Sequence, residues 1–389
     1  MSVNSEPRRS MLLMAGAILA NGAAGLLYVW SLFILPIEAS LGLGRADLGL
    51  ISSLALISFT AGASVMPAIL ARIGRIGVAC IAFALIAGGH LVFGLWPSWT
   101  ALALGYGLGF GAGSGAAYAF ALSLAASLPA QVRAVAIGVA LGAFALSGIL
   151  LPVTLGGWIA AAAPESAFLR IGIVVLLVGL FCVLAVLASG ASRRDHEAQT
   201  VAATAPSIDR PFLVLATIFF MLCFIGLAMI SHAAAIAASA GIATPGYAAS
   251  ALTLGYLAGS ILGAPIAERL GERPALMALG VLALLGTLAM FSASPALFFA
   301  GAAIVGVTFG GSGSIMPVLL GMRYGAEHIS RLYGRAIIAY GLAGLIAPDV
   351  AGRLFDRSQS YAPTIGLCVV FAFTAIVAPL LLERSSRGR

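Results

Sequence analysis

The sequence predicts an all-α membrane protein of twelve transmembrane helices, arranged as two pseudo-symmetric six-helix bundles. Three observations support this fold class: the apolar composition, the division into twelve apolar segments, and an internal repeat. Of the 389 residues, 61% are hydrophobic and only 8% are charged, whereas soluble domains are roughly 25% charged. A water-soluble enzyme or nucleic-acid-binding protein could not cover its surface with so few charges, so both classes are excluded.

The apolar segments are separated by charged or Pro/Gly-marked breaks, and each is long enough to cross a bilayer, which takes about 20 residues. The first segment follows Arg8 and Arg9, as in a signal peptide, but it is too long for a cleaved leader and is expected to be a span. The predicted spans are 11–37, 47–70, 77–95, 99–124, 133–160, 168–190, 211–234, 246–267, 274–293, 297–321, 331–352 and 361–382.

One long polar stretch, 191–210, lies between the sixth and seventh spans. We therefore expect two bundles, 1–190 and 211–389, joined by a flexible linker. All 20 basic residues are arginines, and with twelve spans sixteen of them fall on the side of the two termini. Because arginines accumulate on the cytoplasmic side, we expect both termini and the linker there, in a multi-pass protein of the bacterial inner membrane.

The internal repeat relates the two predicted bundles. Three separate groups of residues recur at nearly one offset. The group in the fifth span (Gly138, Gly148, Pro152, Gly156) recurs at 196 residues as Gly334, Gly344, Pro348 and Gly352; Gly74 recurs at 197 as Gly271; and Gly107, Phe110 and Gly111 recur at 199 as Gly306, Phe309 and Gly310. Such a parallel duplication places a transporter's solute site between the two halves, near the middle of the bilayer.

Two loops carry the same signature in both halves. Residues 67–75 read PAILARIGR and residues 264–273 read APIAERLGER. Both resemble the cytoplasmic loop signature of the major facilitator superfamily, in which an acid at a helix end and nearby arginines lock the inner face. The resemblance implies gating roles for Arg72, Arg75, Glu268, Arg269 and Arg273. The first copy has Ala71 in place of the acid, which weakens its lock.

Three spans resemble the oxalate:formate antiporter and monocarboxylate transporter branch of that superfamily. They carry GLLYVWSLF at 25–33, GYGLGFGAGSG at 105–115, and YGR at 333–335 followed by YGLAG at 340–344. The resemblance implies a secondary transporter, such as an antiporter, for a small organic anion. The arginine and lysine that hold carboxylates in the oxalate carriers align with Ser260 and Tyr340. No basic residue therefore stands at either of the two carboxylate-holding positions, which argues against a dicarboxylate. The resemblance favours a monocarboxylate-like anion.

The candidate solute-binding residues combine the resemblance with estimated depth. At about 1.5 Å per residue, Asn21, Phe59, Phe144, Tyr256 and Tyr340 lie near the middle of their spans. Ionisable groups in spans are costly and indicate function. The predicted binding residues are Asn21, Tyr28, Trp30, Tyr118, His232, Tyr256, Ser260, Arg335 and Tyr340; Asp349, near an outer end, is a predicted gate. The alternatives are helix packing for the rings, a hydrated interfacial His232, and a snorkelling Arg335.

Other functions find less support. Efflux of a neutral or amphiphilic compound stays open, because the two membrane cations are missing. An intramembrane enzyme would need a set of acids or metal-binding histidines, and a membrane sensor would usually add a soluble domain. No nucleotide loop occurs in the sequence, and the four cysteines stand singly in apolar runs. We expect no catalytic residues, metal or cofactor, and a monomer whose partners are a small solute and the lipid bilayer.

Overall fold

The structure is a computed structural model that describes residues 5–190, 208–325 and 328–382. It divides into two compact units: unit 1 contains Met1–Leu43 and Ile51–Ala198, and unit 2 contains Gly44–Leu50 and Gln199–Arg389. A short segment, 44–50, therefore packs with unit 2 although it lies within the amino-terminal half of the sequence. Most of the predicted linker, 191–207, lies outside the described residues.

The described residues are helical in both units. The elements of unit 1 are α1 (Ser5–Ala24), η1 (Gly25–Leu32), α2 (Ile34–Leu41), α3 (Arg45–Leu95, its first turn in unit 2), α4 (Trp99–Ala101), η2 (Leu102–Phe110), α5 (Gly111–Ala126), α6 (Ala130–Ala161) and α7 (Pro164–Ala188). The elements of unit 2 are α8 (Arg210–Ser231), α9 (Ala233–Ser239), α10 (Tyr247–Leu270), α11 (Glu272–Ala289), α12 (Pro295–Tyr324), α13 (Ile329–Ser358), α14 (Ala362–Val377) and η4 (Ala378–Leu381).

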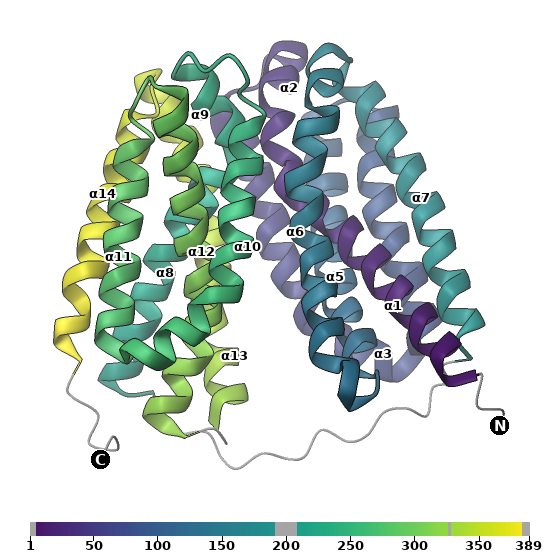
Figure 1. The fold of residues 1–389 in the computed structure, drawn as a ribbon. Helices are drawn as coiled ribbons and strands as arrows, with labels where there is room; N and C mark the ends of the chain where they lie inside the picture. The colour runs from purple at the N-terminus through teal and green to yellow at the C-terminus, as the bar shows by residue number, and fades with distance from the viewer. Residues whose placement is uncertain (1–4, 191–207, 326–327, 383–389) are drawn as a thin grey trace. The chain divides into compact units, whose positions relative to one another are not determined.

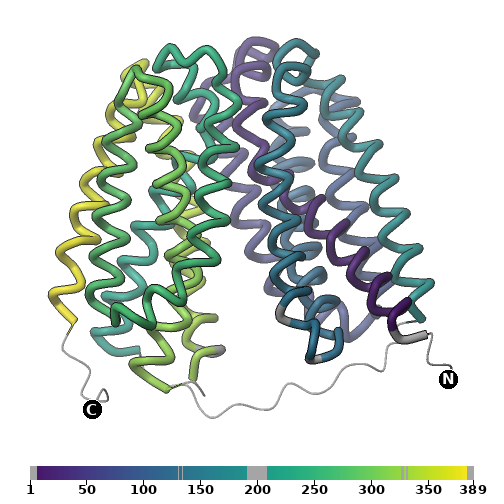
Figure 2. Tube along the Cα trace, in the orientation of Figure 1, coloured from purple at the N-terminus to yellow at the C-terminus, as the bar shows by residue number. Residues whose placement is uncertain are grey.

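Within these described ranges, eleven helical stretches are long and apolar enough to cross a membrane. One of them, α3, has 51 residues and is broken at Gly74 by non-helical backbone angles, so it supplies two spans and the total is twelve. The predicted fold class is confirmed. In unit 2, α12 packs against α10 and α11, and α13 packs against α8. Helix α14 packs against α11, as Figures 1 and 2 show.

Two glycines of the repeat share one unusual backbone conformation. Gly74 has φ 74° and ψ 178°, and Gly271, its counterpart at offset 197, has φ 82° and ψ 172°. This region of conformational space is essentially restricted to glycine. Each glycine turns the chain from one span directly into the next, so the repeat found in the sequence corresponds to a repeated turn.

Close helix packing explains a second part of the repeat. A Cβ on Gly111 would lie 2.8 Å from the Cα of Ala55, and one on Gly310 would lie 2.8 Å from the carbonyl carbon of Tyr256. The absence of a side chain at these positions lets α5 approach α3, and α12 approach α10. Gly138 and Gly334, by contrast, have open space around them, so their recurrence is not explained by packing.

Unit 1 contains two stretches that are not α-helical. The first span continues from α1 into η1, which is a 3₁₀-helix, and the fourth span begins with η2, a π-helix. A 3₁₀-helix turns 120° per residue and a π-helix turns more slowly than an α-helix. These stretches therefore change the direction in which side chains point; Tyr28 and Trp30 lie in η1, and Tyr106 lies in η2.

Candidate functional site

Four aromatic residues of unit 1 meet in one cluster, which we call the amino-terminal aromatic set: Tyr28 of η1, Phe59 of α3, Tyr118 of α5 and Phe144 of α6. The ring of Phe144 lies 5.1 Å from that of Tyr28 and 5.5 Å from that of Tyr118, and Phe59 lies 5.5 Å from Tyr118, measured between centroids. Tyr28, Phe59 and Phe144 are buried, whereas Tyr118 is half-buried. The set thus combines apolar ring faces with two phenol groups.

Asn21 lies on α1 and is fully buried. Its Nδ2 donates to the backbone oxygen of Ala140 on α6 at 2.7 Å, and Ser147 of α6 donates to the backbone oxygen of Gly22 at 2.7 Å. These bonds join α1 to α6. The Oδ1 of Asn21 has no hydrogen-bond partner among the described residues, so it remains a buried acceptor.

Trp30, also a predicted binding residue, lies in a different cluster from Tyr28. Its ring stacks on Tyr106 of η2 with centroids 4.7 Å apart, and Tyr106 in turn contacts His90 and Phe110. The two residues of η1 are two positions apart, which amounts to about 240° in a 3₁₀-helix. Their side chains therefore point to different sides, and only Tyr28 joins the amino-terminal aromatic set.

Three rings of unit 2 form the carboxy-terminal aromatic set: Tyr256 of α10, Phe309 of α12 and Tyr340 of α13. Phe309 lies 5.2 Å from Tyr256 and stacks nearly parallel to Tyr340 at 6.3 Å. Both tyrosines are half-buried. The predicted residues Tyr256 and Tyr340 are thus joined through Phe309, a residue that the sequence analysis noted only as part of the repeat.

Ser260 and Arg335 lie on the same helices as this set. Ser260 is one turn after Tyr256 on α10, and a Cβ on Gly310 would come within 2.7 Å of the Ser260 hydroxyl oxygen. The glycine therefore makes room for that hydroxyl. Arg335 is half-buried on α13, five positions before Tyr340. Tyr256, Ser260, Arg335 and Tyr340 all belong to unit 2.

His232 is fully buried at the end of α8. Its Nε2 lies 3.0 Å from the backbone oxygen of Pro348, and its Nδ1 lies 3.0 Å from the hydroxyl of Tyr361. Because a carbonyl oxygen can only accept, Nε2 carries the proton and the neutral ring accepts at Nδ1 from Tyr361. Both nitrogens are thereby used inside unit 2, so the hydrated interfacial alternative is wrong for His232 and the geometry indicates a bracing role.

The gating residues inferred from the loops differ in their surroundings. Arg72, Glu268 and Arg269 are exposed, while Arg75 and Arg273 are half-buried. Asp349 accepts a hydrogen bond at 2.8 Å from the largely exposed Arg353, one turn later on α13. Arg72 lies two residues before the break of α3 at Gly74, and Arg269 lies in the last turn of α10. Both are therefore near helix ends and outside the aromatic sets.

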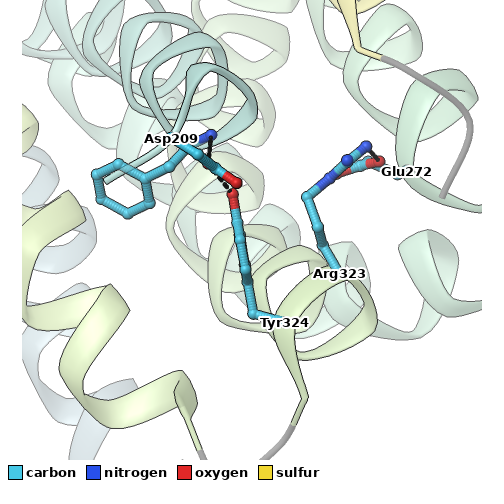
Figure 3. Close-up of polar contacts among 5 residues, drawn as sticks. Asp209, Glu272, Arg323 and Tyr324 are labelled. Carbon is cyan, nitrogen blue, oxygen red and sulfur yellow. Dashed lines mark hydrogen bonds and ion pairs between the residues drawn. The ribbon is translucent and has the colours of Figure 1, made fainter. Parts of the chain in front are cut away.

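A polar cluster near the second loop was missed by the sequence analysis. Glu272, in the first turn of α11, forms a bidentate ion pair with Arg323 of α12, in which Arg323 Nε donates to Oε1 at 2.8 Å. The hydroxyl of Tyr324 donates to Asp209 at 2.5 Å, and Asp209 caps α8 by accepting from the amide of Phe212. Figure 3 shows these groups, which we call the Glu272 network.

The Glu272 network shows which acid of the second loop forms an ion pair. The side chains of Arg323 and Glu272 are only 10% and 12% exposed, whereas Glu268 is exposed. The acid of this loop that pairs with an arginine in the structure is therefore Glu272, four residues beyond Glu268, and the gating role of Glu268 stays a prediction. Asp209 could have been found from sequence, because an Asp just before an Arg-Pro pair is typical of a helix N-cap; the pairing of Glu272 with Arg323 has no such local signal.

Comparison with known proteins agrees with this architecture. A solved structure of a bacterial homolog of the human lysosomal transporter Spinster, in an inward-facing and unoccupied conformation, superposes with a TM-score of 0.73 at 15% identity, over 96% of this chain and 98% of that one. Residues 214–389 match the family model described as Major Facilitator Superfamily. This match covers a little under half of the chain. The chain is thus similar to this superfamily in its carboxy-terminal half, and it has the fold of a multi-pass membrane protein.

Curated proteins match this chain over short stretches. Monocarboxylate transporter 14 of Mus musculus is 34% identical over 68 residues, which are 18% of this chain and 13% of the relative. Glucose transporter GlcP of Staphylococcus epidermidis is 26% identical over 145 residues, 37% of this chain and 32% of the relative. The chain thus matches about a third of these relatives' lengths or less. Among its described residues, no three His, Cys, Asp or Glu side chains gather as a metal site would require.

Proposed function

We propose that this protein is a secondary transporter of the Major Facilitator Superfamily, and that it moves a small monocarboxylate-like organic anion across the bacterial inner membrane by alternating access. The observation that carries the proposal is the carboxy-terminal aromatic set together with Arg335. Tyr340 and Arg335 are five residues apart on α13, a rise of about 7.5 Å along the helix axis and a rotation of about 140° around it. A solute that rests its apolar body on the rings of Tyr256, Phe309 and Tyr340 would meet the carboxylate-binding Arg335 where that long side chain reaches around the helix.

The chemistry of the set favours one negative charge over two. The positions that align with the carboxylate-binding cations of oxalate carriers are Ser260 and Tyr340, both neutral hydroxyl donors. Hydrogen bonds of this kind contribute roughly 0.5–1.5 kcal/mol, and those with a charged partner about 1.5–3 kcal/mol. A single arginine with two hydroxyls suits a monocarboxylate, whereas a second carboxylate would be desolvated without a cation to offset the loss.

Topology and organisation form part of the proposal. We infer that both termini and the linker 191–210 are cytoplasmic, that 1–190 and 211–389 are the two bundles, and that the transporter works as a monomer. Reporter fusions within the linker test the orientation. A reporter that is active only in the cytoplasm should give signal there, and periplasmic activity at the linker would contradict the twelve-span arrangement.

Efflux of a neutral or amphiphilic compound is the second candidate. The observation in its favour is the amino-terminal aromatic set, whose four members (Tyr28, Phe59, Tyr118, Phe144) carry no charge. Aromatic rings of this kind bind the flat apolar part of a solute, whether or not the solute also carries a charge. The two candidates differ in whether Arg335 matters, because a neutral solute gains nothing from a cation.

Uptake by purified protein in proteoliposomes tests the proposed function. The probes are radiolabelled benzoate, lactate, oxalate, glucose and an amphiphilic dye, with protein-free liposomes as the control. We expect uptake of benzoate or lactate and none of oxalate. The same compounds are added in a thermal-shift assay, because a ligand that binds only the folded state raises its stability. A shift or uptake confined to the dye would favour the efflux candidate instead.

A further inference from the structure

The first turn of α3 is capped by a residue far away in sequence. The backbone amides of Arg45 and Ala46 donate to the carboxylate of Asp356, on α13, at 3.0 and 2.8 Å. The first amides of a helix have no partner within the helix, and a carboxylate is the group best suited to their positive end. Asp356 supplies that cap across 310 residues of sequence, inside unit 2.

The Arg45 side chain is held against the same region. It is 8% exposed, and its guanidinium carbon lies 3.5 Å from the ring centroid of Phe355 and 5.3 Å from that of Tyr361. Arginine over an aromatic face is a favourable cation–π arrangement. Tyr361 also donates to His232, which itself donates to the backbone oxygen of Pro348. Tyr361, one of the two rings against Arg45, is thus held by the buried histidine, and the ring of Phe355 packs on that of Tyr361 at 4.7 Å between centroids.

The backbones of α3 and α13 are in close contact at this point. A Cβ on Gly352 would lie 2.8 Å from the Cα of Ala46, and one on Gly49 would lie 3.2 Å from the Cα of Asp349. Neither glycine has positive φ, so it is the lack of a side chain that permits the approach. Beyond residue 50, α3 packs in unit 1, so only its first turn is held in this way.

We propose that Asp356 is a positioning residue for transport, acting as a latch that holds the first turn of α3 in unit 2 and releases it in each cycle. The inference rests on the proposed function, since it assigns the latch to the alternation that carries solute. Three features support release and rebinding: the contacts are non-covalent, they are concentrated on residues 44–49, and the remainder of α3 packs in unit 1. Transport should therefore be blocked when the latch cannot open.

Cysteine labelling tests the opening without any need for a solute. Leu48 is fully buried, so Leu48→Cys, in a background with the exposed Cys80 changed to Ser, should react with a membrane-impermeant maleimide only when the turn is released. Adding Asp356→Asn or Gly352→Ala should raise the labelling rate roughly tenfold, the factor for about 1.4 kcal/mol. The matched control is Gly366→Ala, because Gly366 of α14 has open space around it. Equal rates in all variants would overturn the latch.

Two checks keep the labelling interpretable. Gel filtration shows whether each variant is folded, and if Asp356→Asn is not, Gly352→Ala and Gly49→Ala carry the test. A side chain at either glycine wedges the helices apart and leaves the carboxylate in place. Faster labelling in the wedge variants supports the latch, and unchanged labelling in folded wedge variants contradicts it.

A disulfide tests the role in transport. A Cβ on Gly44 would lie 3.5 Å from the Cγ of Asp356, the atom whose place the sulfur of a cysteine at 356 would take, so the two sulfurs of the double variant Gly44→Cys/Asp356→Cys should come within bonding reach and cross-link under mild oxidation. We expect benzoate uptake to stop in the oxidised protein and to return with reductant. Uptake that persists in fully cross-linked protein would overturn the inference. Absence of uptake in the parent protein would instead count against the proposed function, while the labelling result would still decide the latch.

Discussion

The two loops that repeat the superfamily signature have one backbone and different side chains. Gly74 and Gly271 turn the chain with nearly the same φ and ψ. Beside Gly271, Glu272 forms a buried ion pair with Arg323, whereas the residue beside Gly74 is Arg75 and the loop has Ala71 in place of an acid. Both copies therefore keep the turn, because its backbone conformation is essentially restricted to glycine. The ion pair between Glu272 and Arg323 is a feature of the copy in unit 2.

Removing the ion pair should have the largest effect on stability. Glu272→Gln leaves Arg323 without its carboxylate in a site where both side chains are nearly buried. Breaking a fully buried pair costs roughly 3–5 kcal/mol, and we expect about 2–3 kcal/mol here because the pair retains some contact with solvent. Thermal unfolding in detergent measures the loss. Glu268→Gln is the matched control, since Glu268 is exposed in the same loop; an equal loss in the control would contradict the assignment.

Replacing the turn glycines should have a smaller effect, equal in the two units. Gly74→Ala and Gly271→Ala each place a side chain where the backbone is essentially restricted to glycine, at about 1–3 kcal/mol. Gly366→Ala, within a helix and in open space, should be neutral or stabilising. Melting temperatures of the three variants compare them directly. A neutral result at either turn glycine would mean that the two turns are not equivalent.

The exposed arginines of the loops should affect rate and leave stability unchanged. We expect Arg72→Ala and Arg269→Ala to slow uptake while leaving solute affinity within a few-fold of the parent, because these exposed helix-end residues lie outside the aromatic sets. The measurement is initial uptake rate together with the dissociation constant from equilibrium binding. A loss of binding as large as that of Tyr340→Phe would show that the arginines contact the solute.

Local patterns predicted most of the fold. Apolar length located the spans, and the recurrence of Gly74 as Gly271 located a turn that only glycine can form. The same reasoning placed Tyr256 and Tyr340 together, because both lie at similar estimated depth. These features depend on residues close in sequence or related by the repeat, so they can be derived without coordinates.

Contacts between distant side chains could not be predicted. Asp356 meets the amides of Arg45 and Ala46 across 310 residues, and nothing near either position indicates the partner. Tyr28 and Trp30 come from one segment of the family resemblance, but residues two positions apart point to different sides of a helix, and the partner of each ring depends on distant helices. The loop signature indicates Glu268 by spacing, whereas the pairing of Glu272 with Arg323 depends on where α12 ends.

The central claim is that Arg335 and the carboxy-terminal aromatic set bind a monocarboxylate. The most direct measurement compares benzoate uptake by Arg335→Gln and Tyr340→Phe with that of the parent in proteoliposomes at equal protein content. Tyr340→Phe removes one hydroxyl bond and should weaken affinity by about tenfold at most. Arg335→Gln removes the charge and should cause the larger loss. Benzoate uptake that survives Arg335→Gln unchanged would contradict the account.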